Sequence, residues 1–265
     1  MLHLIGIGVR KEHINPEMLE SVKKSKKVFL EYYTSFYENS FDELSKHLGK
    51  EIIICDREMI ETKIEKEILE PSKNDDISLL ILGDPLIATT HTDLLLRAKD
   101  MNIKTKIYNN VSIGNFITRT GLQFYKFGKI TSIPFHNEKF MPRTPYLVHI
   151  DNHKMGAHSL FLLDLDPINK KYLKGHEALQ FLLNIPKIMS DNEEIEEKES
   201  YFIDEEIDVM ICSRLGFEDE KIYYGTLAEM LMLDKKENLR EPLCIIIPGD
   251  LHEMERNFID QFRLN

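Results

Sequence analysis

Short apolar runs alternate with amphipathic, helix-like segments through the first part of the chain. These runs are rich in Leu, Ile, Val, Phe and Tyr and are bounded by polar or turn-forming residues, which is typical of buried strands. They cover residues 2–8, 27–33, 51–55, 78–83 and 104–109. Strands that alternate with helices form parallel sheets that are covered by helices. The pattern therefore predicts an α/β domain with a mostly parallel sheet and flanking helices.

Signals for the start of a helix follow the first two strands. Asn15 stands directly before Pro16, and Ser40 is followed three residues later by Glu43. An Asn side chain caps a helix and Pro suits its first turn, whereas Ser-x-x-Glu forms a capping box. We expect helices to begin at both places.

The pattern changes after residue 113. A helix-like segment over 112–128 precedes a weakly patterned stretch from 133 to 156. We place a domain boundary between them, so that the domains cover 1–130 and 131–265. Strand-like or helical patterns then follow at 158–165, 175–189, 209–215, 221–231, 242–249 and 252–262. The longer connections predict a mixed sheet with helices in the second domain.

Charge and cysteine content narrow the class of protein. A net charge of −11 disfavours nucleic-acid binding, which requires clustered Lys and Arg. No apolar run approaches the ~18 to 20 residues that span a membrane. Cys55, Cys212 and Cys244 lack the spacing of metal ligands and lie in or beside apolar runs, so we expect buried thiols, no metal and a cytoplasmic protein. The acidic run 190–200 is read as a solvated helix end or loop.

Two strand ends carry the features of a ligand site. "LIGIGVR" over 4–10 and "GDPLIATTH" over 83–91 both follow apolar strands, and ligands gather at the carboxyl edge of an α/β sheet. Gly6 and Gly8 would let a ligand approach the backbone. Asp84 either accepts hydrogen bonds from a ligand or only stabilises a turn, and both readings stay open.

Other chemistries find little support in the same residues. A dinucleotide fingerprint would need Gly at position 11, where the chain has Lys11, although Glu31 lies near the place of an acidic ribose ligand. His91 is not accompanied by a GxSxG motif. The hydroxyls of "TTHTD" would equally well cap the next helix. The residues themselves therefore indicate a site for a polar small molecule and do not identify it.

Several segments resemble one known family, the diphthine synthases, which are tetrapyrrole-methylase-like methyltransferases dependent on S-adenosylmethionine. The matching segments are "MLHLIGIG", "VFLEYYTS", "GDPLIATTHTDLLLRA", "NNVSIGNFITRTGLQFYKFG", "HSLFLLDL", "SRLG", "KIYYGTLAEM" and "PLCIIIPGDLHEMERNFI". They run in family order across nearly the whole chain. The resemblance implies two α/β domains with S-adenosylmethionine between them, usually in a homodimer, and translation elongation factor 2 as the protein substrate.

The resemblance also implies the residues that contact the cofactor. Carried over position by position, they are Val9, Asp84, Ile87, Ser112, Ile113, Leu163, Ser213 and Cys244. Arg10 and Cys244 depart from the family, which usually has Gly and commonly has His at these positions. His91 and Asp93 are candidates for assisting proton removal from the substrate amine.

The product that the resemblance implies depends on the branch of the family. Archaeal members trimethylate the amine of 3-amino-3-carboxypropyl-histidine, and eukaryotic members add a methyl ester. "NNVSI" and "GLQFYKFG" are similar to the eukaryotic form, which favours the methyl ester. The alternatives are amine trimethylation alone, a precorrin or uroporphyrinogen methylase, and a silent module that binds the cofactor without catalysis.

Overall fold

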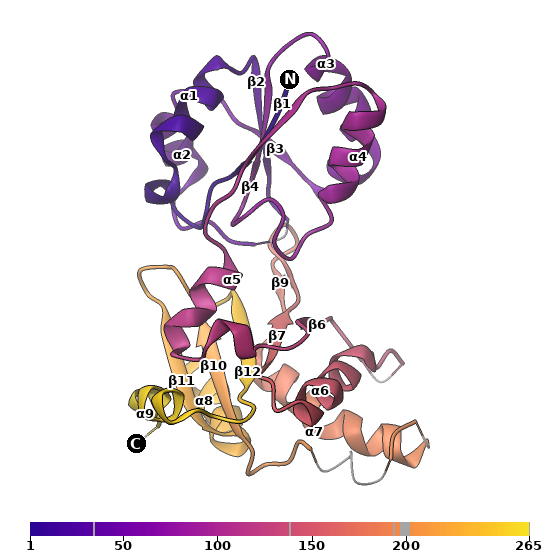
Figure 1. Ribbon diagram of the computed structural model, residues 1–265, viewed down its shortest axis with the longest axis vertical. Coiled ribbons are helices and arrows are strands. Elements are labelled where there is room, and N and C mark those ends of the chain that lie inside the picture. The colour runs from indigo at the N-terminus through magenta and orange to yellow at the C-terminus, as the bar shows by residue number, and fades with distance from the viewer. Residues whose placement is uncertain (34, 138, 193, 197–201, 265) are drawn as a thin grey trace. The chain divides into compact units, whose positions relative to one another are not determined.

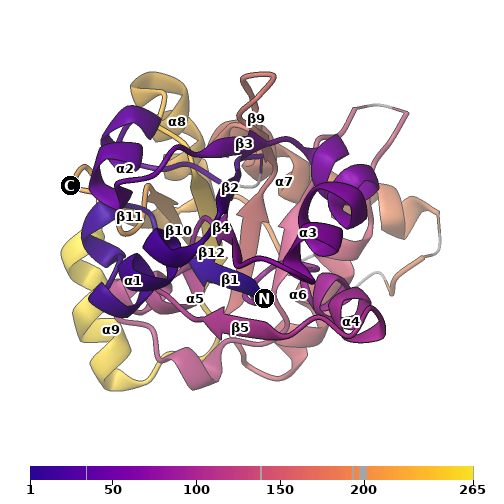
Figure 2. The same ribbon diagram turned by 90° about the horizontal axis from the view of Figure 1, so that it is seen from above.

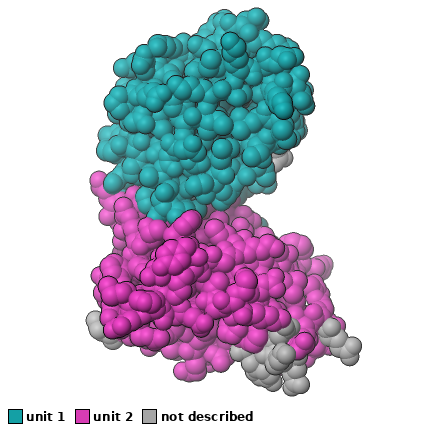
Figure 3. Space-filling model, in the orientation of Figure 1, with its two compact units in different colours: residues 1–116, 166–171 teal, residues 117–165, 172–265 magenta. Residues whose placement is uncertain are grey.

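The chain forms two compact units, which Figure 3 shows in different colours. The computed structural model describes residues 1–33, 35–137, 139–192, 194–196 and 202–264. Unit 1 comprises Met1–Phe116 and Asp166–Lys171, and unit 2 comprises Ile117–Leu165 and Tyr172–Asn265. The chain therefore first passes from one unit to the other after Phe116. The boundary expected from the sequence pattern lies further along the chain, after residue 130.

Unit 1 is built on a parallel sheet of five strands in the order β3-β2-β4-β1-β5. Four strands fall inside the predicted apolar runs and β4 begins one residue before its run, at Ile77, so the sequence prediction is confirmed. The strands are β1 (Leu2–Gly6), β2 (Lys27–Glu31), β3 (Ile53–Cys55), β4 (Ile77–Ile81) and β5 (Thr105–Tyr108). The central strands β1 and β4 are buried along their whole length, as expected for a parallel sheet covered on both faces.

Helices cover both faces of this sheet (Figures 1 and 2). One face carries α1 (Pro16–Lys24) and α2 (Phe41–Leu48), and the other carries α3 (Glu70–Ser72), α4 (Thr92–Asp100) and the π-helical turns over 59–69. Because side chains alternate along a strand, Ile5 packs towards α1 and α2 whereas Leu4 packs towards α4.

Both predicted helix starts are confirmed. Asn15 Oδ1 accepts a hydrogen bond of 3.0 Å from the Met18 amide, and Pro16 occupies the first turn. Ser40 and Glu43 form a complete capping box. These local signals work because each cap satisfies amide groups that the first helical turn leaves unpaired.

Unit 2 contains a mixed sheet in the order β11-β10-β12-β7-β6, which confirms the second sheet prediction. Only β6 and β7 run parallel within it, and the remaining pairs are antiparallel. The strands are β6 (Thr131–Ile133), β7 (Ser159–Leu163), β10 (Asp208–Ser213), β11 (Lys221–Thr226) and β12 (Leu243–Ile247). A small separate ladder joins β8 (Leu165–Asp166) to β9 (Lys171–Tyr172).

The main core of unit 2 lies between this sheet and three helices. They are α6 (Thr144–Lys154), α7 (Gly175–Asp191) and α8 (Leu227–Glu237). Phe161, Ile211 and Ile245 of the sheet pack in one cluster with Leu179 of α7 and Met230 of α8. A further helix, α9 (Glu253–Ile259), follows the last strand.

Two parts of the sequence reading need correction here. Helix α6 lies inside the stretch described as weakly patterned, because it is buried on several sides, Tyr146, His149 and Asn152 included, and shows no apolar stripe. The helix-like segment over 112–128 is broken into α5 (Ile113–Phe116) and two 3₁₀ turns, with Gly121 between them at φ 83°. Only glycine adopts that conformation without strain.

The three cysteines are buried and free, as predicted. Cys212 of β10 stands directly opposite Cys244 of β12 in the antiparallel register. The hydrogen bond between the two side chains, together with burial, raises the pKa of the Cys212 thiol. Among the residues that the structure describes, no helix is both long and apolar enough to cross a membrane. The part of the acidic run over 197–200 and residue 193 lies outside the described residues.

Candidate functional site

Three loops meet at the carboxyl edge of the sheet in unit 1. They follow β1, β4 and β5, which are neighbours in the sheet. Gly8 and Gly83 exchange backbone hydrogen bonds of 3.1 and 2.8 Å, and Asn110 Nδ2 donates to the carbonyl oxygen of Gly6 at 2.8 Å. The loops therefore form one connected surface at the place where α/β proteins bind ligands.

The glycines of this edge are explained by contacts inside the protein. A Cβ on Gly6 would lie 2.7 Å from the Gly83 carbonyl oxygen and 2.8 Å from Pro85 Cδ. Gly8 has φ 63°, and a Cβ there would meet the His13 ring at 2.4 Å. The space that we assigned to a ligand at these two positions is thus filled by neighbouring loops and by His13.

Asp84 fixes the turn that follows β4. Its side chain is buried, and Oδ1 accepts from the Leu86 amide at 2.8 Å. Oδ2 accepts from Asn109 Nδ2 at 3.0 Å and from the Asn110 amide at 2.9 Å. The turn role is therefore confirmed. A carboxylate has about four acceptor positions, so one position on Oδ1 is left for a ligand.

Ser112 carries the feature that best fits a missing ligand. Its Oγ is buried and has no hydrogen-bond partner among the described residues. The side chain lies beside the Gly83–Asp84 turn, since a Cβ on Gly83 would be 3.2 Å from Ser112 Cβ. Buried polar groups are normally hydrogen-bonded, so an unpaired one at a candidate site points to a partner from outside the chain.

The remaining unit 1 candidates border the same loops. Val9 is buried, Ile113 is half-buried at the start of α5, and Ile87 is exposed beside Gly114. Arg10, the departure from the family, turns back on its own loop, where its Nε lies 3.3 Å from His13 Nε2. The structure thus brings Asp84, Ile87, Ser112 and Ile113 together, and Val9 joins them through the Gly8–Gly83 contact.

His91 and Asp93 lie in different environments. His91 is buried, with Nε2 2.7 Å from Oε2 of Glu31, and Nδ1 2.6 Å from Thr89 Oγ1 and 3.1 Å from the Pro85 carbonyl oxygen. Asp93 is exposed on α4 and paired with Arg97. Glu31 is only 1% exposed, so the carboxylate that a dehydrogenase would offer to a ribose is occupied by His91.

Electrostatics give His91 a charged character. Burial lowers the pKa of an imidazole, but here the hydrogen bond and charge of Glu31, helped by the Pro85 carbonyl, outweigh burial and raise the pKa of His91. Both ring nitrogens face acceptors. An imidazolium with two N–H groups suits this arrangement.

The three unit 2 candidates lie at one edge of the mixed sheet. Leu163 ends β7 and Ser213 ends β10, whereas Cys244 lies near the start of β12, which runs antiparallel to both. Ser213 Oγ donates to the Arg240 carbonyl oxygen at 2.6 Å. Since this hydroxyl is occupied, Ser213 would meet a ligand through its main chain.

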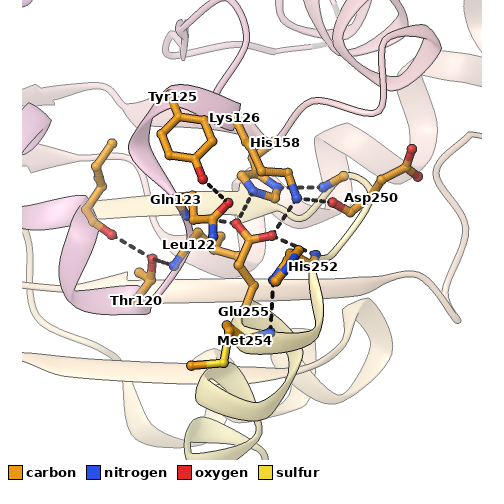
Figure 4. Close-up of polar contacts among 12 residues, drawn as sticks. Thr120, Leu122, Gln123, Tyr125, Lys126, His158, Asp250, His252, Met254 and Glu255 are labelled. Carbon is orange, nitrogen blue, oxygen red and sulfur yellow. Dashed lines mark hydrogen bonds and ion pairs between the residues drawn. The ribbon is translucent and has the colours of Figure 1, made fainter.

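Sequence reasoning missed a buried carboxylate in unit 2, which Figure 4 shows. Glu255 is 1% exposed and accepts from the amides of Gln123 and His252, each at 2.8 Å, from His158 Nε2 at 3.0 Å and from Lys126 Nζ. We call these five residues the Glu255 cluster. Burial opposes the charge, but Lys126 and the other donors lower the pKa of Glu255 to about 2.

The Glu255 cluster joins segments that are distant in sequence. Gln123 and Lys126 belong to the "TGLQFYKFG" motif, His158 lies just before β7, and Glu255 is in the first turn of α9. No short-range spacing signals such a cluster. The Glu255 side chain is visible in sequence only as the third residue after His252, where it completes a capping box.

Among the described residues, no three His, Cys, Asp or Glu side chains are grouped so that they could hold a metal ion. The unit 1 edge offers hydrogen-bonding groups, which are Asp84 Oδ1 and Ser112 Oγ. Its residues suit a polar organic ligand that offers a donor to Asp84 and a partner to the Ser112 hydroxyl.

Comparisons with known proteins show the family of the chain. Residues 1–231 match the family described as Tetrapyrrole (Corrin/Porphyrin) Methylases. A "Diphthine synthase" of Methanococcus aeolicus is 38% identical over 259 residues, which cover 97% of this chain and 96% of that protein. A "Diphthine methyl ester synthase" of Dictyostelium discoideum is 36% identical over 275 residues, and the match covers 100% of this chain and 98% of that protein. The crystal structure of a "putative diphthine synthase" from Entamoeba histolytica superposes with a TM-score of 0.85 at 30% identity, over 100% of this chain and 99% of that one.

The fold and the family match define a methyltransferase of the S-adenosylmethionine-dependent class. Within that class, the relatives described above match over their full length and are named diphthine synthase and diphthine methyl ester synthase. The chain belongs to the diphthine synthase family of tetrapyrrole methylases.

Proposed function

We propose that this protein transfers methyl groups from S-adenosylmethionine to the 3-amino-3-carboxypropyl-histidine of translation elongation factor 2 and forms diphthine methyl ester. The observation that carries the proposal is the buried, unpaired Ser112 hydroxyl beside the Asp84 turn, in a chain with full-length similarity to a diphthine methyl ester synthase. The similarity to "NNVSI" and "GLQFYKFG" of the eukaryotic form supports the ester as the final product.

The cofactor is proposed to contact residues of both units. In unit 1 these are Val9, Asp84, Ile87, Ser112 and Ile113, with Ser112 Oγ and the remaining position on Asp84 Oδ1 as hydrogen-bonding groups. In unit 2 they are Leu163, Ser213 and Cys244. The Cys244 thiol is paired with Cys212 and buried, so main-chain atoms suit the contact there.

The bound cofactor supplies a methyl group on a sulfonium. The protein then has to align the attacking atom with that methyl carbon and exclude water, which contributes about 7 to 11 kcal/mol in favourable cases. A primary amine is mostly protonated at neutral pH and has to lose a proton before it attacks. Burial of the amine lowers its pKa and favours this loss without a dedicated base.

The sister reaction, methylation of an anionic tetrapyrrole, is not favoured. The full-length relatives of this chain are named diphthine synthase and diphthine methyl ester synthase, which disfavours a tetrapyrrole as the substrate. The silent-module reading rested on the departures at Arg10 and Cys244. Arg10 is accommodated by His13, which weakens that argument.

The defining test is mass spectrometry of elongation factor 2 that carries the unmethylated precursor, after incubation with this protein and S-adenosylmethionine. We expect four methyl groups on the modified histidine, one of which is lost under mild base because it is an ester. Three base-stable methyl groups would identify the amine methylase instead. None, with cofactor binding intact, would overturn the substrate assignment.

Ser112→Ala tests the cofactor site separately. Because the Ser112 hydroxyl makes no bond inside the described chain, its removal should leave thermal stability unchanged and weaken the binding of S-adenosylhomocysteine about tenfold. Ser25→Ala is the matched control, since Ser25 Oγ is buried and bonded to Ser21 and Ser78. It should lower stability without changing affinity. Equal affinity in Ser112→Ala and the wild type would remove Ser112 from the site.

We also propose a cytoplasmic homodimer, by resemblance to the family. Light scattering coupled to size-exclusion chromatography tests the assembly. A mass of one chain, rather than two, would contradict it.

A further inference from the structure

The loop over 84–91 is fixed at both of its ends. Asp84 anchors its start through Leu86, Asn109 and Asn110. His91 anchors its end through Glu31 of β2 and through two groups of the loop itself, Pro85 and Thr89. The proposed cofactor contact Ile87 lies between the two anchors and is exposed.

The backbone between the anchors is strained. Ala88 has φ 56°, a left-handed conformation that residues with a side chain rarely adopt. Such a conformation persists only where the surroundings impose it. The anchors at Asp84 and His91 are therefore what hold Ala88, and with it Ile87, in the observed shape.

Hydrogen-bond roles determine the protonation of His91. A carbonyl oxygen only accepts, so the 3.1 Å contact with Pro85 favours a proton on Nδ1, and the Thr89 hydroxyl, 2.6 Å from the same nitrogen, is able to accept as well as to donate. Glu31 Oε2 lies 2.7 Å from Nε2, and a carboxylate there requires a second proton on the ring. An imidazolium with both protons engaged has no lone pair, so it is unable to accept a proton from a substrate amine.

We propose that His91 is a positioning residue, a buried imidazolium paired with Glu31 that holds the 84–91 loop in the shape that binds the cofactor. This inference rests on the proposed function, because it takes the loop as a cofactor contact. It replaces the role of proton acceptor that the sequence suggested for His91.

The charged and titratable groups around the pair agree with this role. Glu31 faces His91 from β2, and Cys55 stands opposite Glu31 on β3. Burial, with the charges of Glu31 and Asp56, raises the pKa of Cys55 to about 12, so it stays neutral. On α4, Asp93 is engaged with Arg97 at the surface. From the loop, His91 meets the neutral groups of Pro85 and Thr89.

The pair makes cofactor binding sensitive to alkaline pH. The raised pKa of His91 means that the anchor is complete below the ordinary value of 6.5 and is lost as the pH rises through the folded-state pKa. In Glu31→Gln the cation loses its partner while burial remains, so the same loss should occur about 1 to 3 pH units lower.

Calorimetry with S-adenosylhomocysteine across pH, combined with NMR of ¹⁵N-labelled histidines, tests the inference. We expect wild-type affinity to fall on the alkaline side and the midpoint to move down in Glu31→Gln. In His91→Gln the pH step should vanish and affinity should drop about tenfold, or about 1.4 kcal/mol. His47→Gln, an exposed change on α2, is the matched control and should behave as wild type. The NMR spectrum of the wild type should show both N–H protons on His91.

The outcomes separate the inference from the proposed function. A wild type that fails to bind overturns the cofactor site and the positioning role together. Wild-type binding that His91→Gln leaves unchanged in affinity and pH profile overturns the positioning role alone, as does a neutral His91 facing a protonated Glu31. If His91→Gln fails to fold, the His91→Gln, Glu31→Gln double variant replaces it, because its neutral pair leaves no buried charge and should bind without the pH step.

Discussion

Each unit contains a buried glutamate–histidine pair that holds a loop in place. The histidine is charged in the unit 1 pair and neutral in the unit 2 pair. In both, a histidine Nε2 faces a glutamate that is 1% exposed. The pKa of His91 is raised by Glu31, whereas burial, assisted by the charge of Lys126, lowers the pKa of His158 despite Glu255. The same two side-chain types therefore make an ion pair in unit 1 and a bond from a neutral ring in unit 2.

The second ring nitrogen explains the difference. Nδ1 of His91 faces the Pro85 carbonyl oxygen, which favours a proton on that nitrogen, whereas Nδ1 of His158 accepts from the Gly249 amide at 2.9 Å, which requires a lone pair. Lys126 already supplies a cation to Glu255, so a second cation would be unfavourable. The comparison shows that a buried carboxylate does not by itself decide the charge of its histidine.

The largest expected effect follows from removing the charge of Glu255. Glu255→Gln should lower the free energy of unfolding by about 3 to 5 kcal/mol, because one amide is unable to satisfy the donors that the carboxylate accepts, Lys126 among them. Urea denaturation measures it. Glu253→Gln, an exposed change in the same helical turn, should stay within about 0.5 kcal/mol. A loss as small as that control would show that the cluster is not a structural anchor.

Acid should weaken unit 2 through the same residue. The pKa of Glu255 is lowered to about 2 from an ordinary 4.5, so its contribution is complete above 4.5 and is lost as pH falls towards 2. The loss is on the order of 3 kcal/mol. The lowered pKa of His158 acts in the same direction. Urea titrations from pH 6 to pH 2 should show this loss in wild type and a flatter profile in Glu255→Gln, and parallel profiles would contradict the prediction.

Lys126→Met tests which group makes His158 titrate differently from His91. Without the neighbouring cation, the pKa of His158 should rise. The Gly249 amide still needs the lone pair on Nδ1, so His158 should continue to titrate below His91. NMR titration of both histidines measures this order. A reversed order would show that Lys126, and not the Nδ1 partner, separates the two pairs.

The smallest effect concerns an exposed carboxylate. Asp93 is 62% exposed and paired with Arg97 one helical turn away. Asp93→Asn should change stability by less than about 0.5 kcal/mol and methyl transfer by less than about twofold. A tenfold loss of methyl transfer at unchanged stability would restore Asp93 as a catalytic candidate.

The sequence reveals those parts of the molecule that local physics decides. The unit 1 strands, the Asn15 cap and the Ser40–Glu43 capping box each depend on residues a few positions apart. The two glutamate–histidine pairs depend on distant residues instead, since Glu31 and His91 are 60 residues apart and His158 and Glu255 are 97 residues apart. Only the folded sheet brings them together, and a single sequence gives no signal for their contact.

The same limit, which is contact between residues far apart in sequence, applies to the candidate site. Resemblance placed Asp84 and Ser112 at one edge, and the structure connects the loops that carry them. It did not reveal that Gly6 and Gly8 serve packing between loops, or that His91 is held on both sides of its ring. The sequence pattern did not predict helix α6, because a helix that is buried on several sides lacks the apolar stripe that periodicity detects.

The burial of all three cysteines has a practical consequence for spectroscopy. Cys55, Cys212 and Cys244 are each at most 3% exposed, and a thiol reacts with maleimides as the accessible thiolate. A single cysteine introduced at an exposed position would therefore be labelled selectively in the otherwise unaltered chain. Fluorescent reporters can be attached without first removing the native thiols, and the contact between Cys212 of β10 and Cys244 of β12 is left intact.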